Sequence, residues 1–319
     1  MSDLEKNEIF KNEMVAPFIT EHANIDPSTF IGEYGGYMDK LAVVAKAESG
    51  EVLYQSSIAP PLIDKENFVE HVSNIASYLD IKVYIAMHAF LDKLFHKKFK
   101  VIGLDSEKPP TPDVDFICPN RKGYWKYLAE IMVEVVKLQI SGIFLLDFRY
   151  PWRNYCFCTE CIKDFRTRED LPVYFHYGLL EEKSETYDKW LEWRSEILYD
   201  ALKSLTDRMN SLGTEVPVIL EIIVDPISQM LEGVFKYFGQ DLRKLSNLAN
   251  GFILNIYPYS MLSKDDINEE VFEPILAINK PIYMLYTKKP SISDFEILKN
   301  IAKIVDAKKI FLDISQIIS

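Results

Sequence analysis

Short runs of apolar residues recur along the chain and alternate with amphipathic stretches. Most runs are continuous and rich in Val, Ile, Leu, Phe or Tyr, a composition typical of strands that are buried on both faces of a parallel sheet. The eight runs lie at residues 14–19, 41–45, 83–87, 143–148, 216–224, 251–257, 282–286 and 310–314.

The stretches between these runs predict helices. Apolar residues recur with a helical period along four of them, at 65–79, 121–139, 188–212 and 292–306. Asp64 is a candidate N-cap of the first helix, and Gly213 stands at the C′ position after the third. Eight strands that alternate with helices predict an α/β fold, namely the closed (β/α)8 TIM barrel. We expect it to form one domain over residues 1–319. The segment VLYQS at 52–56 suggests an extra strand, paired as a hairpin beside the second barrel strand.

Composition and charge narrow the range of partners. The chain has 319 residues, is 48% hydrophobic and can bury a large core. Its net charge of −12 argues against nucleic acid and against an anionic membrane surface. No window approaches the roughly 18 apolar residues of a membrane span, and the start, MSDLEKNEIFKNE, does not look like a signal peptide. We therefore expect a cytoplasmic protein, with a homo-oligomer left open.

The cysteines form a pattern. The chain has four, Cys118, Cys156, Cys158 and Cys161, and the last three read C-x-C-x-x-C. Four thiolates from two neighbouring barrel loops predict a closed tetrahedral zinc site, structural because no coordination position is left for a substrate. Disulfides fit less well, since such close neighbours cannot all pair without strain and a cytoplasmic protein is kept reduced. An iron–sulfur cluster stays open, although its usual longer run of spacings is missing.

Two segments resemble a known family. CPN at 118–120 and CFCTECIKDF at 156–165 are similar to the zinc-loop pattern of family 42 β-galactosidases. GIFLLDFRYP at 142–151 and the segment 238–260 resemble the fourth- and sixth-strand regions of a wider group of glycoside-hydrolase barrels. The resemblance covers residues 80–290 and implies a barrel with a metal-stapled loop at about 149–187 and a carbohydrate substrate.

The chain departs from that family at both catalytic positions. Family 42 enzymes end their fourth strand with Asn-Glu, where the Glu is the acid/base, and this chain has Leu146-Asp147. The family places its Glu nucleophile on the seventh strand, which reads PIYMLYT here and has no carboxylate. The resemblance therefore does not imply β-galactosidase activity.

Other carboxylates are candidates for the chemistry. Most glycosidases use two carboxyl groups that flank the scissile bond. Asp147 ends the fourth strand and is the predicted nucleophile, kept ionised by Arg149; an ion pair that only braces the loop is the alternative. On the fifth strand, VILEIIVDP, Asp225 is the predicted acid/base, and Glu221, about 13 Å deeper along the strand, is the reserve. Asp313 is a third choice.

The strand ends also supply candidate binding residues, because active sites of this fold lie at the C-terminal ends of the strands. Structural packing is the alternative for each of them. The predicted substrate-binding residues are His22, His88, Arg149, Trp152, Tyr257 and Tyr286, and the other strand-end polar residues are Glu21 and Asn255.

These observations favour a glycoside hydrolase with paired carboxylates and a structural zinc. The alternative is a catalytically inactive barrel that binds carbohydrate or a protein, which the absence of a seventh-strand carboxylate supports. A third hypothesis is another hydrolase or lyase with a second metal at His22, His88 and Asp147.

Overall fold

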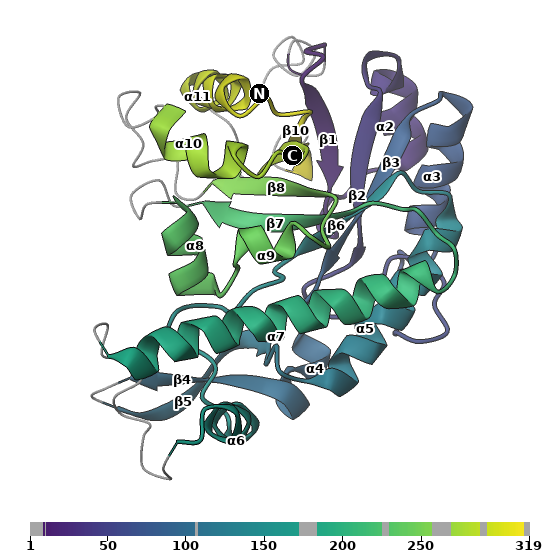
Figure 1. The fold of residues 1–319 in the computed structure, drawn as a ribbon. Helices are drawn as coiled ribbons and strands as arrows, with labels where there is room; N and C mark the ends of the chain where they lie inside the picture. The colour runs from purple at the N-terminus through teal and green to yellow at the C-terminus, as the bar shows by residue number, and fades with distance from the viewer. Residues whose placement is uncertain are drawn as a thin grey trace.

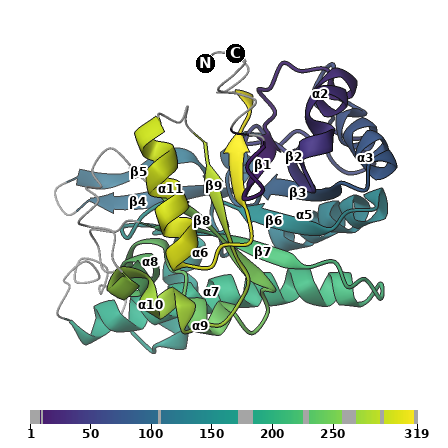
Figure 2. The same ribbon diagram turned by 90° about the horizontal axis from the view of Figure 1, so that it is seen from above.

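The protein folds as a closed barrel of eight parallel strands surrounded by helices (Figures 1 and 2). This computed structural model describes residues 9, 11–105, 108–171, 184–224, 230–256, 269–287 and 292–315. Around the barrel the strand order is β1-β10-β9-β8-β7-β6-β3-β2. The strands are β1 Val15–Ile19, β2 Lys40–Lys46, β3 Lys82–His88, β6 Gly142–Leu146, β7 Val218–Val224, β8 Gly251–Ile256, β9 Ile282–Tyr286 and β10 Ile310–Asp313. Each overlaps one predicted apolar run, so the predicted TIM barrel is confirmed.

The helices include all four that the sequence predicts. They are α2 Pro27–Tyr34, α3 Phe68–Tyr78, α4 Lys93–Phe99, α5 Lys122–Val135, α6 Thr159–Arg168, α7 Glu185–Asn210, α8 Met230–Phe238, α9 Leu242–Leu245, α10 Glu269–Leu276 and α11 Ile292–Ile304. The predicted cap of α3 is wrong: Asn67 precedes the helix, and Asp64 lies in the turn before it with a φ of 65°. Within the described parts of the chain, no helix is long and apolar enough to cross a membrane.

A two-stranded antiparallel hairpin, β4 Lys100–Asp105 and β5 Lys108–Ile117, extends the connection between β3 and α5. The sequence did not predict it, because β5 contains three prolines and proline removes a ladder donor. The extra strand expected at 52–56 is reduced to single bridges from Val52 to Lys46 and Pro61. The hairpin lies beside α6 in Figure 1.

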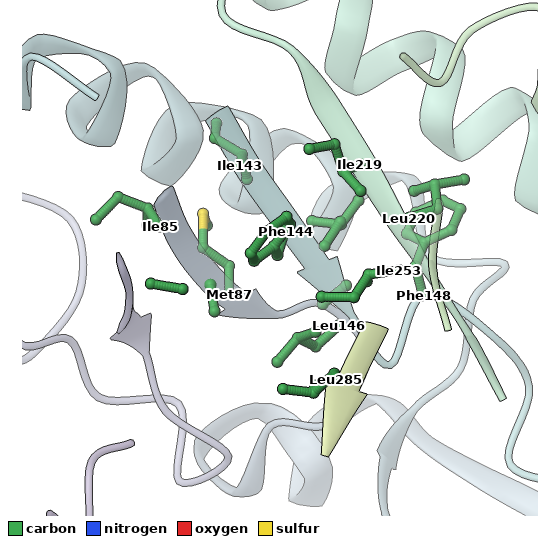
Figure 3. Packing of buried hydrophobic residues seen from close by; sticks show 14 of the residues in the cluster. Ile85, Met87, Ile143, Phe144, Leu146, Phe148, Ile219, Leu220, Ile253 and Leu285 are labelled. Atoms are coloured by element: carbon green, nitrogen blue, oxygen red, sulfur yellow. The ribbon is translucent and has the colours of Figure 1, made fainter. Parts of the chain in front are cut away.

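The barrel interior is filled in layers. Rings of Tyr84, Phe144, Tyr283 and Phe311, from β3, β6, β9 and β10, pack at centroid distances of 5.0–6.2 Å. Side chains alternate across a strand, so the next inward residues toward the C-terminal ends form the layer above. Leu146 and Leu285 belong to that layer, and Figure 3 shows them beside Phe144. The aromatic layer therefore closes the barrel interior below its C-terminal mouth and forms the floor of any cavity there.

Candidate active site

A cavity of about 360 Å³ lies above this floor, at the C-terminal ends of the strands. Its apolar wall includes Phe18, Leu91, Phe116, Leu146, Ile223 and Leu285. Its charged and titratable lining consists of Glu21, His22, Glu48, His88, Asp147, Arg149, Glu221 and Asp313. The site therefore gathers carboxyl groups from strands that are far apart in the sequence, where a TIM barrel places its chemistry.

Asp147 lies at the centre of this polar group. It is the first residue after β6, and its φ of 51° turns the chain sharply there. One of its carboxylate oxygens lies 2.7 Å from His88 Nδ1, and the other accepts a hydrogen bond of 2.9 Å from Arg149 Nη2. Burial alone would raise the pKa of Asp147, but these two partners outweigh it and hold the pKa below its ordinary value. Asp147 is therefore ionised in the folded protein.

Glu221 is the second carboxyl group of the centre. The backbone N–H of Asp147 donates to its Oε2 at 2.7 Å, and Asn255 Nδ2 donates to its Oε1 at 2.8 Å. Burial, followed by the negative charge of Asp147, raises the pKa of Glu221 above its ordinary value. The pKa values of the two carboxyl groups are thus shifted in opposite directions, which is the electrostatic pattern of an acid and a base at one site.

The structure places the other predicted residues unevenly. His88 and Arg149 line the cavity, as does His22, whose side chain is 80% exposed at the rim. Asp225 and Tyr257 lie outside the described residues. Glu221, the reserve candidate, is in the cavity wall: Leu145 pairs with Leu220 in the β6–β7 register, so Glu221 lies level with Leu146, in the layer above the aromatic floor.

Trp152 and Tyr286 do not line the cavity. Trp152 stacks on Tyr237 with ring centroids 4.5 Å apart. Tyr286 is buried, while its neighbours Leu285 and Thr287 line the cavity. Burial and the carboxyl group of Asp294 in α11 raise the pKa of Tyr286 to about 12. Its ring therefore packs on the helix side of β9, so the prediction that it contacts substrate in the cavity does not agree with its position.

Asp313, the third choice for the chemistry, also lines the cavity. It accepts from the Ser315 backbone N–H at 2.9 Å; burial first, and the charge of Glu21, raise its pKa. Two other lining residues had no role assigned from the sequence: Glu48 follows β2 in a turn, and Phe116 lies near the end of the unpredicted hairpin. The only sequence signal for Glu48 as a site residue was its position just beyond a strand end. Many surface residues share that position, so it does not single out Glu48.

A buried ion pair braces the backbone beside His88. Lys46 Nζ lies 2.9 Å from Asp92 Oδ2 and donates to the His88 carbonyl oxygen at 2.9 Å. Asp92 also accepts from the Phe95 backbone N–H, which caps α4, and from the Tyr124 hydroxyl at 2.9 Å. Both members of the pair have fully buried side chains. This network fixes the end of β3, and hence the position from which the His88 ring reaches Asp147.

We expect Lys46→Met to lower the free energy of unfolding by about 3–5 kcal/mol, because it leaves Asp92 buried without its counter-ion. Lys40→Met is the matched control on the same strand. Lys40 pairs with the half-exposed Asp39 at 2.7 Å, and its loss should cost no more than about 1 kcal/mol. Denaturant unfolding measures both variants. Equal losses would show that the Lys46–Asp92 pair has no special structural role.

The four cysteines converge as the sequence predicts. Their Sγ atoms all lie within 4.8 Å of one another, with Cys118 at 3.3 Å from Cys161 and 3.7 Å from Cys158. These separations exceed a disulfide bond of about 2.05 Å. They are close to the edge of about 3.8 Å of a tetrahedron with metal–sulfur bonds of about 2.3 Å. The cluster is therefore compatible with metal binding.

Polar donors surround the sulfur atoms. The Ile102 backbone N–H donates to Cys156 Sγ at 3.4 Å, and Arg121 Nη2 lies 3.8 Å from Cys158 Sγ. Cys158 is the N-cap of α6, whose helix dipole favours negative charge at that end. This donor set suits thiolates that hold a cation. Among the described residues, no other three or more metal-ligating side chains converge, so His22, His88 and Asp147 do not form a second such group.

The cluster joins two segments that also border the cavity. Cys118 directly follows β5, two residues after the lining residue Phe116. The segment that leads to Cys156 begins at Asp147 and contains Arg149, whose guanidinium lies 4.9 Å from the Phe116 ring centre. The Phe157 backbone N–H donates to the Ile102 carbonyl at 2.7 Å, which ties this segment to β4. A metal bound here would thus hold one wall of the cavity together.

Comparisons with known proteins show the fold. No family model matches the chain, and no curated protein matches it significantly. Among solved structures, the glycoside hydrolase domain of PgaB (BpsB) from Bordetella bronchiseptica is 11% identical, with a TM-score of 0.66 over 94% of this chain and 93% of that one. α-L-Fucosidase isoenzyme 2 from Paenibacillus thiaminolyticus is 16% identical, with a TM-score of 0.69 over 94% and 46%.

A β-galactosidase from the psychrophilic Marinomonas ef1 is 8% identical, with a TM-score of 0.61 over 93% of this chain and 53% of that chain. The chain thus spans about half the length of the fucosidase and of the β-galactosidase. At these identities the likeness is one of fold. The chain has a TIM-barrel fold like that of these glycoside hydrolases, with a four-cysteine cluster beside the barrel mouth.

Proposed function

We propose that the protein is a glycoside hydrolase in which Asp147 and Glu221 are the paired carboxyl groups. The observation that carries this function is that both line one cavity, joined by the hydrogen bond from the Asp147 backbone N–H to the Glu221 carboxyl group, and that their pKa values shift in opposite directions. A carboxyl group with a raised pKa beside one with a lowered pKa is the pairing that cleavage of a glycosidic bond requires. Asp225 remains the alternative acid/base.

Each group has a defined part in the reaction. Glu221 donates its proton to the leaving glycosidic oxygen, while an Asp147 oxygen forms a bond to the anomeric carbon. Water then attacks that carbon and gives a proton back to Glu221, which frees the sugar from Asp147. His22, His88 and Arg149 hydrogen-bond sugar hydroxyls at the rim and walls, and Tyr257 stays a candidate binding residue.

The metal of the cysteine cluster is zinc in this proposal. Cys118, Cys156, Cys158 and Cys161 would supply all four ligands, which leaves the ion a structural role. The support is the sulfur geometry and the surrounding donors.

One observation favours a binding protein without catalysis. Strand β9, the seventh of the barrel, carries no carboxylate between Ile282 and Tyr286. A barrel of this kind would still bind carbohydrate in the cavity, but Glu221 and Asp147 would serve only as hydrogen-bonding groups. Turnover of glycosides separates the two functions.

The pH dependence of turnover tests the assignment. Activity needs Asp147 ionised, so kcat/KM should rise with pH until Asp147 has lost its proton below its ordinary pKa of 3.8. Activity also needs Glu221 protonated, so kcat/KM should fall as pH passes a value above the ordinary 4.5. The two limbs report the coupled pair. The measurement is release of nitrophenol from a panel of aryl glycosides.

Glu221→Gln should remove the falling limb, because the amide does not titrate. Residual turnover of glycosides with good leaving groups should then be flat at higher pH. A falling limb that persists unchanged in Glu221→Gln would assign the acid to another carboxyl group, with Asp225 next in line.

A further inference from the structure

An exposed aromatic surface lies outside the cavity and has no part in the chemistry above. The Trp152 side chain is 43% exposed and stacks flat on Tyr237, with ring centroids 4.5 Å apart and an interplanar angle of 13°. Phe238 meets the indole edge-on at 5.5 Å. The other three tryptophans, Trp125, Trp190 and Trp193, are buried. The chain thus presents a single indole to solvent, on a rigid support.

A buried arginine fixes this support. Arg194 of α7 is fully buried and donates to the carbonyl oxygens of Trp152 at 2.9 Å and of Tyr237 at 3.0 Å. A third donation, at 3.0 Å, goes to the Lys236 carbonyl, and the guanidinium lies 4.5 Å from the Tyr150 ring centre. Burying a charge is costly unless it is hydrogen-bonded, and both terminal nitrogens of Arg194 donate. Here the donors hold the loop that carries Trp152 against the last turn of α8, which carries Tyr237.

The Trp152–Tyr237 pair lies close to the cavity wall. The ring centre of Phe238 lies 5.2 Å from the guanidinium carbon of Arg149. Arg149 lines the cavity and binds Asp147. Phe238 is buried and contacts both Arg149 and the indole, so the Trp152–Tyr237 pair lies one ring away from the cavity wall, within reach of a ligand that extends past Arg149.

We propose that Trp152 and Tyr237 form a sugar-binding platform, and that the substrate is an oligosaccharide or polysaccharide whose chain runs from the cavity across it. The inference rests on the hydrolase function proposed above and specifies its substrate class. One face of a pyranose ring carries polarised C–H bonds, which stack on the negative face of an indole. Because the indole is already held in place, binding costs little ordering.

The size of the surface favours a sugar over a protein partner. A large aromatic side chain buries about 150–250 Å², whereas a stable protein interface buries roughly 1,200 Å² or more. A stacked pair of rings matches one sugar unit. Its closeness to the cavity wall matches a chain of such units.

Fluorescence quenching tests the platform without catalysis. We would use Asp147→Asn, so that ligands are not consumed, and measure acrylamide quenching of tryptophan emission. The ligands are cello-, malto- and chito-oligosaccharides, each from the monosaccharide to the hexasaccharide. Protection of Trp152 should be absent with monosaccharides and appear with longer chains in at least one series. Stacking on a sugar face is tolerant of sugar identity, so these series sample the relevant chemistry.

Two variants identify the residue. With Trp152→Ala the exposed, quenchable emission should disappear, and affinity for the longest protecting chain, measured by calorimetry, should fall about tenfold. Tyr78→Ala is the matched control: it removes an exposed aromatic ring, 87% exposed on α3, and should leave affinity unchanged.

Each outcome decides one point. No protection in any series, or unchanged affinity in Trp152→Ala, overturns the platform. Protection by long chains that wild-type protein does not hydrolyse keeps the platform and rejects the hydrolase. Hydrolysis of aryl glycosides without protection of Trp152 keeps the hydrolase and rejects the platform.

Discussion

Asp147→Asn should reduce turnover of glycosides by at least about 10²-fold and as much as about 10⁴-fold. The amide cannot act as a nucleophilic carboxylate, and it no longer supplies the charge that raises the pKa of Glu221. Asparagine tolerates the left-handed backbone at this position, where φ is 51°, so the fold should persist. The measurement is kcat/KM on aryl glycosides, with circular dichroism to verify folding.

The chain offers a close control in Asp306→Asn. Asp306 also has a left-handed φ, 48°, and also pairs with a cation two residues on, with Lys308 Nζ at 2.6 Å. Its side chain is 87% exposed and lies outside the cavity lining. Asp306→Asn should therefore retain full activity. Full activity in Asp147→Asn as well would remove Asp147 from the chemistry and favour the binding function.

If the cysteine cluster binds a metal as proposed, loss of that metal should destabilise the fold more than any side-chain change described above. We expect one tightly bound metal per chain, measured by elemental analysis. Cys161→Ser, which should abolish that binding, should lower the free energy of unfolding by more than about 5 kcal/mol, since metal binding free energy in closed sites is folding free energy. Activity should fall as well, because Phe116 and Arg149 border the cavity from the two segments that the cluster joins.

Thr159→Ala is a control in the same segment. Thr159 is exposed and lies between two cysteines, so its loss should leave metal content and stability unchanged. Metal-free protein that unfolds like the metal-loaded form would show that the four thiols are only a packed part of the interior.

The barrel was predictable because parallel strands buried on both faces appear in the sequence as short continuous apolar runs, such as residues 251–257. The cysteine cluster was predictable because C-x-C-x-x-C spacing is rare outside metal sites. The depth of Glu221 was misjudged for a physical reason. Strand rise gave the height of its Cα below Asp225, but not the register of β7 with β6, which sets Glu221 level with Leu146 and next to Asp147.

The β4–β5 hairpin could not be predicted from the sequence, and the orientation of Tyr286 needed an argument from side-chain alternation. The hairpin β4–β5 is hidden by its prolines, and with it the place of Phe116 in the wall. The position of Tyr286 follows from alternation: if Tyr283 and Leu285 point into the barrel, Tyr286 points out. Strand-end position alone does not say which face a side chain takes.

The cysteine cluster also bears on the order in which the chain can assemble. It connects Cys118 to Cys161, and the intervening chain contains α5 and β6, one helix–strand unit of the barrel. Barrel closure instead pairs Val15 with Ile310, close to the two ends of the sequence. Closing a short loop costs less chain entropy than closing a long one. A metal bound by the cluster, as proposed above, would therefore organise the β4–α6 region while the later strands are still being made, and the final strand would then close the barrel around a preformed wall.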